Sequence, residues 1–264
     1  MLEKTQNIMT AYLCAKAINS TIKNCKIIDS NIQTLSGTNR FYFGSLVAYA
    51  KNCCIDKCYS NSMLGKRNNS AYSYSEDDIY VGGLVGYILG TEQNYSQISN
   101  SYCENGLSIN KDYNFNLNLN ANFSGFIGYA KYCNVTNSYS TSSLYVRLEI
   151  HDNALIKVGG IVAKGENCNI INCFSTGDYQ YDGANGVVRY QGGYALVGEL
   201  SNKSTMKNCY SLTKLLDIDK KYTTVLTDCV ANTTCQQIYE NIKNLWDTEI
   251  WSFSTNSPPV FKEE

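Results

Sequence analysis

The sequence predicts an all-β fold, a parallel β-helix or β-solenoid of about six repeats that ends in a short C-terminal capping segment. Three observations predict it. A short apolar segment flanked by small residues recurs along the chain, and a second motif follows each copy in nearly constant register. Between these motifs apolar and polar residues alternate with a period of two, which places the apolar set on one face of a strand. A recurring period of this length is typical of stacked repeats.

Each repeat begins with an apolar anchor between small residues, most clearly Gly-Gly-Leu-Val-Gly at residues 82–86. The six anchors are Leu13, Leu46, Leu84, Phe126, Ile161 and Leu196. Successive anchors lie 33, 38, 42, 35 and 35 residues apart. Such a segment is too short for a helix, and glycines around an aliphatic pair fit a short buried strand. We therefore expect the anchors to face the core as structural positions of the repeat.

The second motif has the form apolar, any residue, polar, Cys or Ser, aromatic, and it starts nine residues after the anchor in four copies. Its polar position is an asparagine in five of the six copies, and Lys57 is the exception. The asparagines are Asn24, Asn100, Asn137, Asn172 and Asn208. Because stacked side-chain amides hydrogen-bond along a ladder, this column favours a solenoid.

Further strands are expected after the second motif, where residues 115–123 and 144–150 alternate cleanly. Each repeat would then hold about three strands, as one coil of a parallel β-helix does. The insertions at 61–79, 104–114 and 178–191 are expected to emerge as loops from one side. A β-sandwich and a β-propeller, whose blades are ~40–45 residues long, are the alternative folds.

The predicted organisation has three parts. Residues 1–10 are a lead-in, residues 11–239 carry the repeats of 33–42 residues, and residues 240–264 form the capping segment. We expect the two tryptophans of that segment, Trp246 and Trp251, to cover the open end of the last coil. Because the first repeat begins almost at once, we also expect the chain to be part of a longer protein with neighbouring domains.

The twelve cysteines follow the repeat and allow three interpretations. Stacked free thiols are favoured, because Cys packs as a small hydrophobe and exchanges with Ser at matching positions. Disulfides between adjacent coils remain open, since strands lie about 4.8 Å apart. The pairs would be Cys25 with Cys58, Cys133 with Cys168, and Cys173 with Cys209. Zinc is the third option, with residues 53–58 as the nearest approach to paired ligands.

Composition argues against several classes of function. The net charge is −1, from 22 basic and 23 acidic residues, so no basic footprint for nucleic acid is expected. No apolar run approaches the ~20 residues that span a bilayer, and no secretory signal is visible. The acidic candidates lack a recurring basic partner; they are Glu76, Asp77, Asp78, Glu149, Asp178 and Asp182. We therefore expect no catalytic residues, no cofactor and no metal site.

The repeat resembles the GLUG-motif repeat of bacterial and some protist surface proteins. Two stretches carry the likeness most clearly: residues 81–87 leading to 98–102, and residues 159–162 leading to 170–177. The resemblance implies a β-solenoid displayed outside the cell, often within adhesin-like proteins. Some members carry a metallopeptidase on another domain, but this chain has a single histidine, His151, and no His-Glu-x-x-His motif.

These observations predict a non-enzymatic module, extracellular or at the cell surface, that acts in adhesion or as a structural spacer. A glycan or an extracellular protein would be its ligand. Candidate ligand contacts are the aromatic residues of the second motif, Tyr59, Tyr102, Tyr139, Phe174 and Tyr210, although stacking of these rings in the core is an equal alternative. A polysaccharide lyase or hydrolase on a β-helix and an intracellular repeat scaffold are the other hypotheses.

Overall fold

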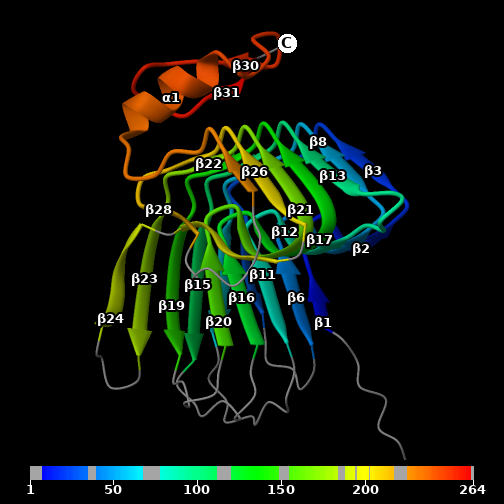
Figure 1. Ribbon diagram of the computed structural model, residues 1–264. Coiled ribbons are helices and arrows are strands. Elements are labelled where there is room, and N and C mark those ends of the chain that lie inside the picture. Colours follow the sequence, from blue (N-terminus) through cyan, green and yellow to red (C-terminus); the bar gives the residue numbers. More distant parts are fainter. Residues whose placement is uncertain are drawn as a thin grey trace, which may run out of the picture.

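A computed structural model of the chain describes residues 8–34, 40–67, 78–111, 120–148, 155–183, 188–193, 195–201, 203–216 and 225–262. The protein is a β-solenoid, as predicted. Parallel strands of successive coils stack side by side into sheets that run along the axis, and one short helix lies against the stack (Figure 1).

Each regular coil contributes strands to four sheets. The first sheet stacks β1 (Ile8–Thr10), β6 (Phe41–Gly44), β11 (Ile79–Gly82), β16 (Asn120–Ser124) and β20 (Leu155–Gly159). The third stacks β4 (Lys26–Ile27), β9 (Tyr59–Ser60), β14 (Tyr102–Cys103), β18 (Tyr139–Ser140), β22 (Phe174–Ser175) and β27 (Tyr210–Ser211).

The second sheet is the widest, because it bends and carries two strands from most coils. Its first limb stacks β2 (Cys14–Ile18), β7 (Val47–Lys51), β12 (Val85–Leu89), β17 (Ile127–Thr136), β21 (Val162–Ile171), β25 (Ala195–Ser201) and β28 (Lys214–Leu216). Its second limb stacks β3 (Thr21–Lys23), β8 (Cys54–Asp56), β13 (Ser96–Ser99), the later halves of β17 and β21, then β26 (Thr205–Lys207) and β29 (Val225–Thr227).

The fourth sheet corrects the prediction of three looped insertions. It stacks β5 (Asn31–Thr34), β10 (Met63–Arg67), β15 (Gly106–Lys111), β19 (Ser143–Leu148), β23 (Asp178–Gly183) and β24 (Val188–Gly193). Parts of all three expected loops are therefore strands, and the remainder of them lies largely outside the described residues. The last strand, β24, runs antiparallel to β23.

The number of repeats differs slightly from the predicted six. In the described residues the first sheet holds five strands. Among these residues the sixth repeat contributes β25 to the second sheet and no strand to the first. The repeat is regular in the middle of the chain and irregular at its C-terminal end.

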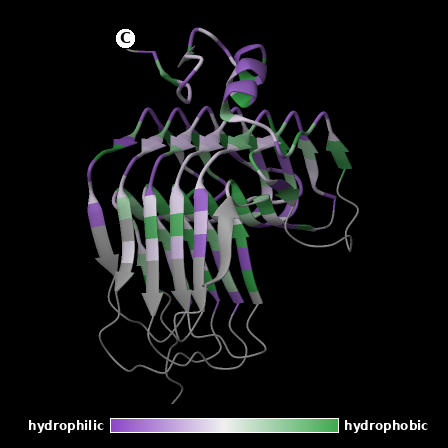
Figure 2. Cartoon of the chain, turned by 90° about the vertical axis from the view of Figure 1, so that its left-hand side faces the viewer, coloured by the Kyte–Doolittle hydropathy of each residue, from purple (hydrophilic) through white to green (hydrophobic). Residues whose placement is uncertain are grey.

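The core has two lobes, which give each coil a bent cross-section (Figure 1). One lobe lies between the first and fourth sheets, and the other inside the bend of the second sheet. Five of the six anchors, from Leu46 to Leu196, have no exposed surface and line the second lobe. Figure 2 shows the corresponding pattern from the side, with hydrophilic turns along one edge of the stack.

Leu13 is the exception among the expected anchors, because 48% of its surface is exposed. It occupies the same column as Leu46, but its coil is the first and has a neighbouring coil on one side. The predicted position of Leu13 in the repeat is correct, but the prediction that its side chain faces a closed core is wrong.

The glycines of the first motif allow close approach of the chain at the corner between the first two sheets. A Cβ atom on Gly82 would meet the carbonyl oxygen of Val85, and one on Gly159 would meet that of Val162. Any larger residue would force the backbone to move, so the small residues flanking the anchor reflect packing at this corner.

The predicted asparagine ladder is present. The amide of Asn137 donates to Asn100 at 3.3 Å, Asn172 donates to Asn137 at 2.9 Å, and Asn208 donates to Asn172 at 3.0 Å. These residues have φ between 45° and 54°, in the left-handed region, where asparagine is tolerated better than most residues. The column therefore fixes both the turn and the stacking of the coils.

The C-terminal segment lies along the flank of the solenoid, which corrects the prediction that it covers the last coil's end. It consists of α1 (Cys235–Lys243), which starts with a capping box formed by Thr234 and Gln237, then β30 (Trp251–Ser252) and β31 (Val260–Phe261). Figure 1 shows it beside the third sheet, across several coils.

Candidate functional site

The aromatic stripe expected to contact a ligand is buried, so that prediction is wrong for four of its five residues. Tyr102, Tyr139, Phe174 and Tyr210 are between 0% and 7% exposed. Tyr59 is half-buried, and its hydroxyl donates to Glu104 at 3.0 Å. The stripe belongs to a third hydrophobic cluster, between the third sheet and the C-terminal segment.

Stacking and coverage explain this burial. The rings of Tyr139 and Phe174 are parallel within 3°, with centroids 4.7 Å apart. Trp246 and Trp251 cover them, and the Tyr139 hydroxyl donates to the carbonyl of Pro259 at 2.7 Å. Aromatic faces that a ligand would need are thus occupied by the chain itself.

A second set of tyrosines, which the sequence analysis did not single out, faces away from the core. Tyr42 and Tyr129 are buried, at 5% and 8% exposure, and Tyr49, Tyr80 and Tyr87 are half-buried. We call the surface that they form the inner corner, since it lies where the outer faces of the first and second sheets turn toward each other. One column of the inner corner contains Tyr42, Tyr80, Asn122 and Lys157. The other contains Lys16, Tyr49, Tyr87, Tyr129, Lys164 and Glu199.

The repeat itself places these residues. The tyrosines of the second column lie three residues after an anchor, and those of the first lie four residues before one. Since side chains alternate along a strand, both positions face away from the core. This offset from the anchors is the signal in the sequence that would have identified the surface.

The tyrosine rings pack against one another in both directions. Along the second column Tyr49 and Tyr87 stack at 5.4 Å, and Tyr87 and Tyr129 at 4.6 Å. Across the corner Tyr42 and Tyr80 meet them edge to face, with Tyr42 and Tyr49 5.6 Å apart. The ring faces are largely used by these contacts, so the surface presents ring edges and hydroxyl groups.

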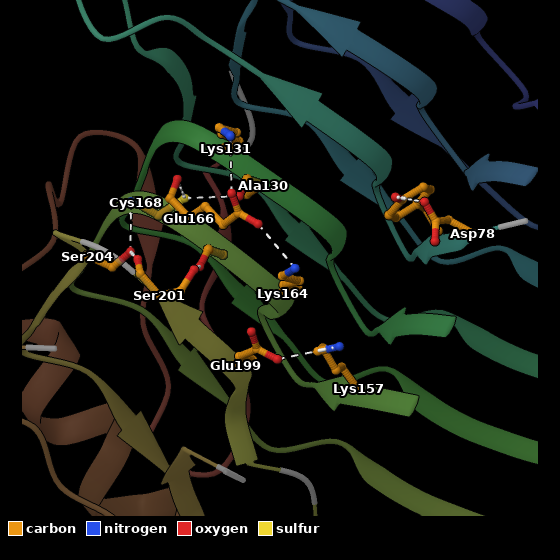
Figure 3. Close-up of polar contacts among 12 residues, drawn as sticks. Asp78, Ala130, Lys131, Lys157, Lys164, Glu166, Cys168, Glu199, Ser201 and Ser204 are labelled. Atoms are coloured by element: carbon orange, nitrogen blue, oxygen red, sulfur yellow. Dashed lines mark hydrogen bonds and ion pairs between the residues drawn. The ribbon is translucent and has the colours of Figure 1, made fainter. Parts of the chain in front are cut away.

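Two ion-pair groups follow the tyrosines in the later coils (Figure 3). Lys157 contacts Glu199 at 3.5 Å, with both side chains at most 12% exposed. Glu166 contacts Lys131 and Lys164, each at 3.2 Å. The inner corner therefore changes along the axis from phenol groups to paired charges.

The ionisation of these groups reflects their surroundings. Burial, followed by the nearby Asp78 carboxylate, raises the pKa of Tyr80. Burial also raises the pKa of Tyr87 to about 12 and that of Tyr129 further. Burial alone would raise the pKa of Glu166, but hydrogen bonds from two lysines and from Tyr129 hold it below its usual value. At neutral pH the surface carries neutral phenols and an ionised, saturated carboxylate.

The pKa of Glu166 bears on whether this carboxyl group could act as a general acid. A glycosidase needs a carboxylic acid whose pKa is raised so that it can protonate a leaving group. The pKa of Glu166 is shifted in the opposite direction. Hydroxyls, ammonium groups and carboxylates fixed by one another instead form a preorganised hydrogen-bonding surface.

A separate depression lies over the fourth sheet. Its lining includes Met63, Ser143, Tyr145, Asp178 and Gln180. Of the residues that line it, Asp178 carries the one carboxylate. Within the described ranges no three His, Cys, Asp or Glu side chains are grouped as metal ligands would be.

All twelve cysteines are free thiols in the structure. Cys133 and Cys168 are neighbours in one column, and both are buried. Burial raises the pKa of Cys58, Cys168 and Cys173 to about 12. These thiols are packed as small core residues and are poor nucleophiles at neutral pH.

In the described part of the chain, no helix has the length and hydrophobicity needed to cross a bilayer. No protein-family model, no curated protein and no solved structure matches the chain. The function is therefore argued from the geometry of the solenoid and its surface.

Proposed function

We propose that the chain is a non-enzymatic repeat module that acts outside the cell or at the cell surface, in adhesion or as a structural spacer. The inner corner is the observation that carries the adhesive role. It is built from matching positions of successive coils that face away from the core, with tyrosines in the earlier coils and paired charges in the later ones. A surface that continues from coil to coil suits an extended ligand, because such a ligand can contact several coils at once.

The ligand class follows from which atoms the surface offers. Tyr49 and Tyr87 are half-buried and present ring edges and hydroxyl groups. A phenol hydroxyl both donates and accepts hydrogen bonds, so it can pair with the hydroxyl groups of a ligand. We therefore favour a hydroxyl-rich glycan, which supplies many donors, over a largely apolar partner.

The spacer role has its own support. Ladders of backbone, amide and aromatic contacts join each coil to the next, and the C-terminal segment contacts side chains from several coils. Such a structure resists bending more than a linker does, and it can hold a neighbouring domain at a fixed distance.

The test is binding of the purified chain to a panel of glycans and extracellular proteins, with bound glycans checked for cleavage. We expect saturable binding without cleavage. Tyr87→Ser should weaken binding at least tenfold, which corresponds to about 1.4 kcal/mol. The matched control is Tyr95→Ser, since Tyr95 pairs with Tyr132 at 5.7 Å outside the inner corner.

Other outcomes separate the remaining hypotheses. Equal loss in both variants, or binding unaffected by Tyr87→Ser, would remove the inner corner as the ligand surface. Absence of any binding would leave the spacer role. Cleavage of a bound glycan would support the polysaccharide-acting enzyme, and retention of the natural protein inside the cell would support the intracellular scaffold.

A further inference from the structure

Large exposed apolar side chains gather at the two ends of the solenoid. Most of those in the described residues belong to the first coil or to the last. They are Leu13, Ile18 and Ile28 at one end, and Val225, Leu226 and Val230 at the other, each between 44% and 59% exposed. An apolar surface at an element's open edge is typical of an interaction site.

The columns explain why these side chains are exposed. Leu226 stacks on Met206, and that column continues through Ile170 and Ile98 down to Ile22 in the first coil. Its interior members have no exposed surface. Leu226 is 44% exposed, and among the described residues no strand pairs with β29 on its far side.

The backbone edges are open at the same places. In the described residues β29 pairs with β26 alone, and β3 pairs with β8 alone. A parallel strand with one neighbour carries unpaired N–H and C=O groups, which form a template for another strand.

We propose that a second copy of this chain docks head to tail, with the first coil of one copy stacked on the last coil of the next. The register of the columns fixes the contact. Ile22 would lie on Leu226, and Leu13 on Leu215, which continues the Leu196 column. Leu13 and Leu226 then gain the apolar neighbour that their columns have elsewhere.

The asparagine ladder supports the head-to-tail direction of this contact, which we call the joint. Along the chain each amide donates to the acceptor in the preceding coil, as Asn208 does to Asn172. At the joint Asn24 would donate to Asp228, and both have left-handed backbones, with φ of 55° and 51°. A carboxylate already fills the acceptor role within the chain, since Asn100 donates to Asp56 at 3.0 Å.

Charge is complementary at the same joint. The exposed Lys23 and Lys26 flank Asn24 at the first coil, and the exposed Asp228 lies at the last. The C-terminal segment lies along the flank (Figure 1), beside the path of the stack. The two contacting surfaces differ and each copy continues the axis of the last, so the contact does not close into a ring and would extend into a filament.

The test is the mass of the intact chain over a concentration series, by light scattering and by electron microscopy. We expect the average mass to rise beyond a dimer, with unbranched filaments as wide as one solenoid. Leu13→Lys and Leu226→Lys should each abolish growth, because each places a charge in the joint. Circular dichroism checks that both variants fold.

Mixing the two variants distinguishes this joint from any symmetric contact. Each variant retains one intact end, and those ends are complementary, so an equal mixture should form a dimer while each variant alone is monomeric. Met63→Lys is the matched control, since Met63 is 55% exposed away from both ends, and it should assemble as the unmodified chain does. A chain that remains monomeric at every concentration, a variant that dimerises alone, or assembly lost in Met63→Lys would each overturn the proposal.

Discussion

The most informative single residues in this protein are the asparagines at the turn after each second-motif strand. Their side chains bond to one another along the axis, and their backbones occupy a conformation that most residues avoid. The recurring asparagine predicted the ladder of amides, whereas the left-handed backbone at these positions was not predicted and is a finding of the structure.

Asn137→Ala should therefore lower the free energy of unfolding by about 3–4 kcal/mol, since Asn137 takes part in two amide bonds. About 1–2 kcal/mol comes from the left-handed backbone, with φ of 47°, and about 1 kcal/mol from each lost amide bond. Asn137→Gly keeps the backbone conformation and loses the amide bonds only, so it should cost less. Urea unfolding of both variants measures the difference, and equal losses would show that the turn conformation contributes nothing.

The tyrosines of the inner corner predict a loss of stability in alkali. Burial raises the pKa of Tyr87 from 10.0 to about 12, so the folded state keeps the proton that the unfolded state loses. This contribution is complete below pH 10 and disappears as the pH rises from 10 to about 12. Melting temperature and absorbance at the phenolate band should change together in that interval. Tyrosines that ionise near pH 10 while the fold stays intact would contradict the burial of these rings.

In each regular coil the anchor lies between the strand of the first sheet and the following strand of the second sheet. The stability of this corner should depend most on the anchor's side chain. Leu84 has no exposed surface, so Leu84→Asp would bury an unpaired carboxylate and cost several kcal/mol. Leu13 occupies the same position of the repeat but is 48% exposed, and Leu13→Asp should be tolerated much better. Thermal melting compares the melting temperatures of Leu84→Asp and Leu13→Asp. Equal losses would show that burial of the anchor does not decide its contribution to stability.

The C-terminal segment should detach as a unit when its central ring is removed. Trp251 is 1% exposed and contacts Tyr102, Tyr139, Trp246 and Phe261. Trp251→Ala should cost about 3–5 kcal/mol, as truncation of a buried aromatic does. Hydrogen exchange should then rise in the segment and along the aromatic stripe. Ser252→Ala, at an exposed neighbour, is the control, and protection unchanged in both variants would show that the segment does not depend on Trp251.

The sequence predicted the positions of the strands better than the surroundings of their side chains. The period of two and the motif register correctly placed the interior anchors, because these properties depend on neighbours within the repeat. The environment of Tyr139 could not be read in this way, since a segment more than a hundred residues later covers it, through the contact with Pro259. The fourth sheet was predicted only in part. The alternation at 144–150 correctly indicated β19, but Met63–Arg67 and the strands within the other expected loops were missed, because an apolar residue such as Leu64 or Leu107 recurs there without glycines on both sides to mark it.

At the scale of the molecule, most contacts join adjacent coils, so stability is roughly a sum over coils and their interfaces. The flank segment departs from this rule. Phe261 contacts Tyr102 in the third coil at 5.0 Å, while Trp246 contacts Phe174 two coils later at 5.7 Å. It therefore couples coils that the solenoid alone would leave independent, which favours unfolding of that region in a single step.

The matching columns also have a consequence for the gene. Ser124 lies beside Gly159 in the first sheet, so residues 125 and 160 occupy equivalent positions of successive coils. A deletion of residues 125–159 would join Ser124 to Gly160 and leave the inward and outward faces of every later strand unchanged. Recombination between copies of the repeat can thus alter the length of the protein in steps of one coil, about 4.8 Å each, and selection can adjust reach without designing a new interface.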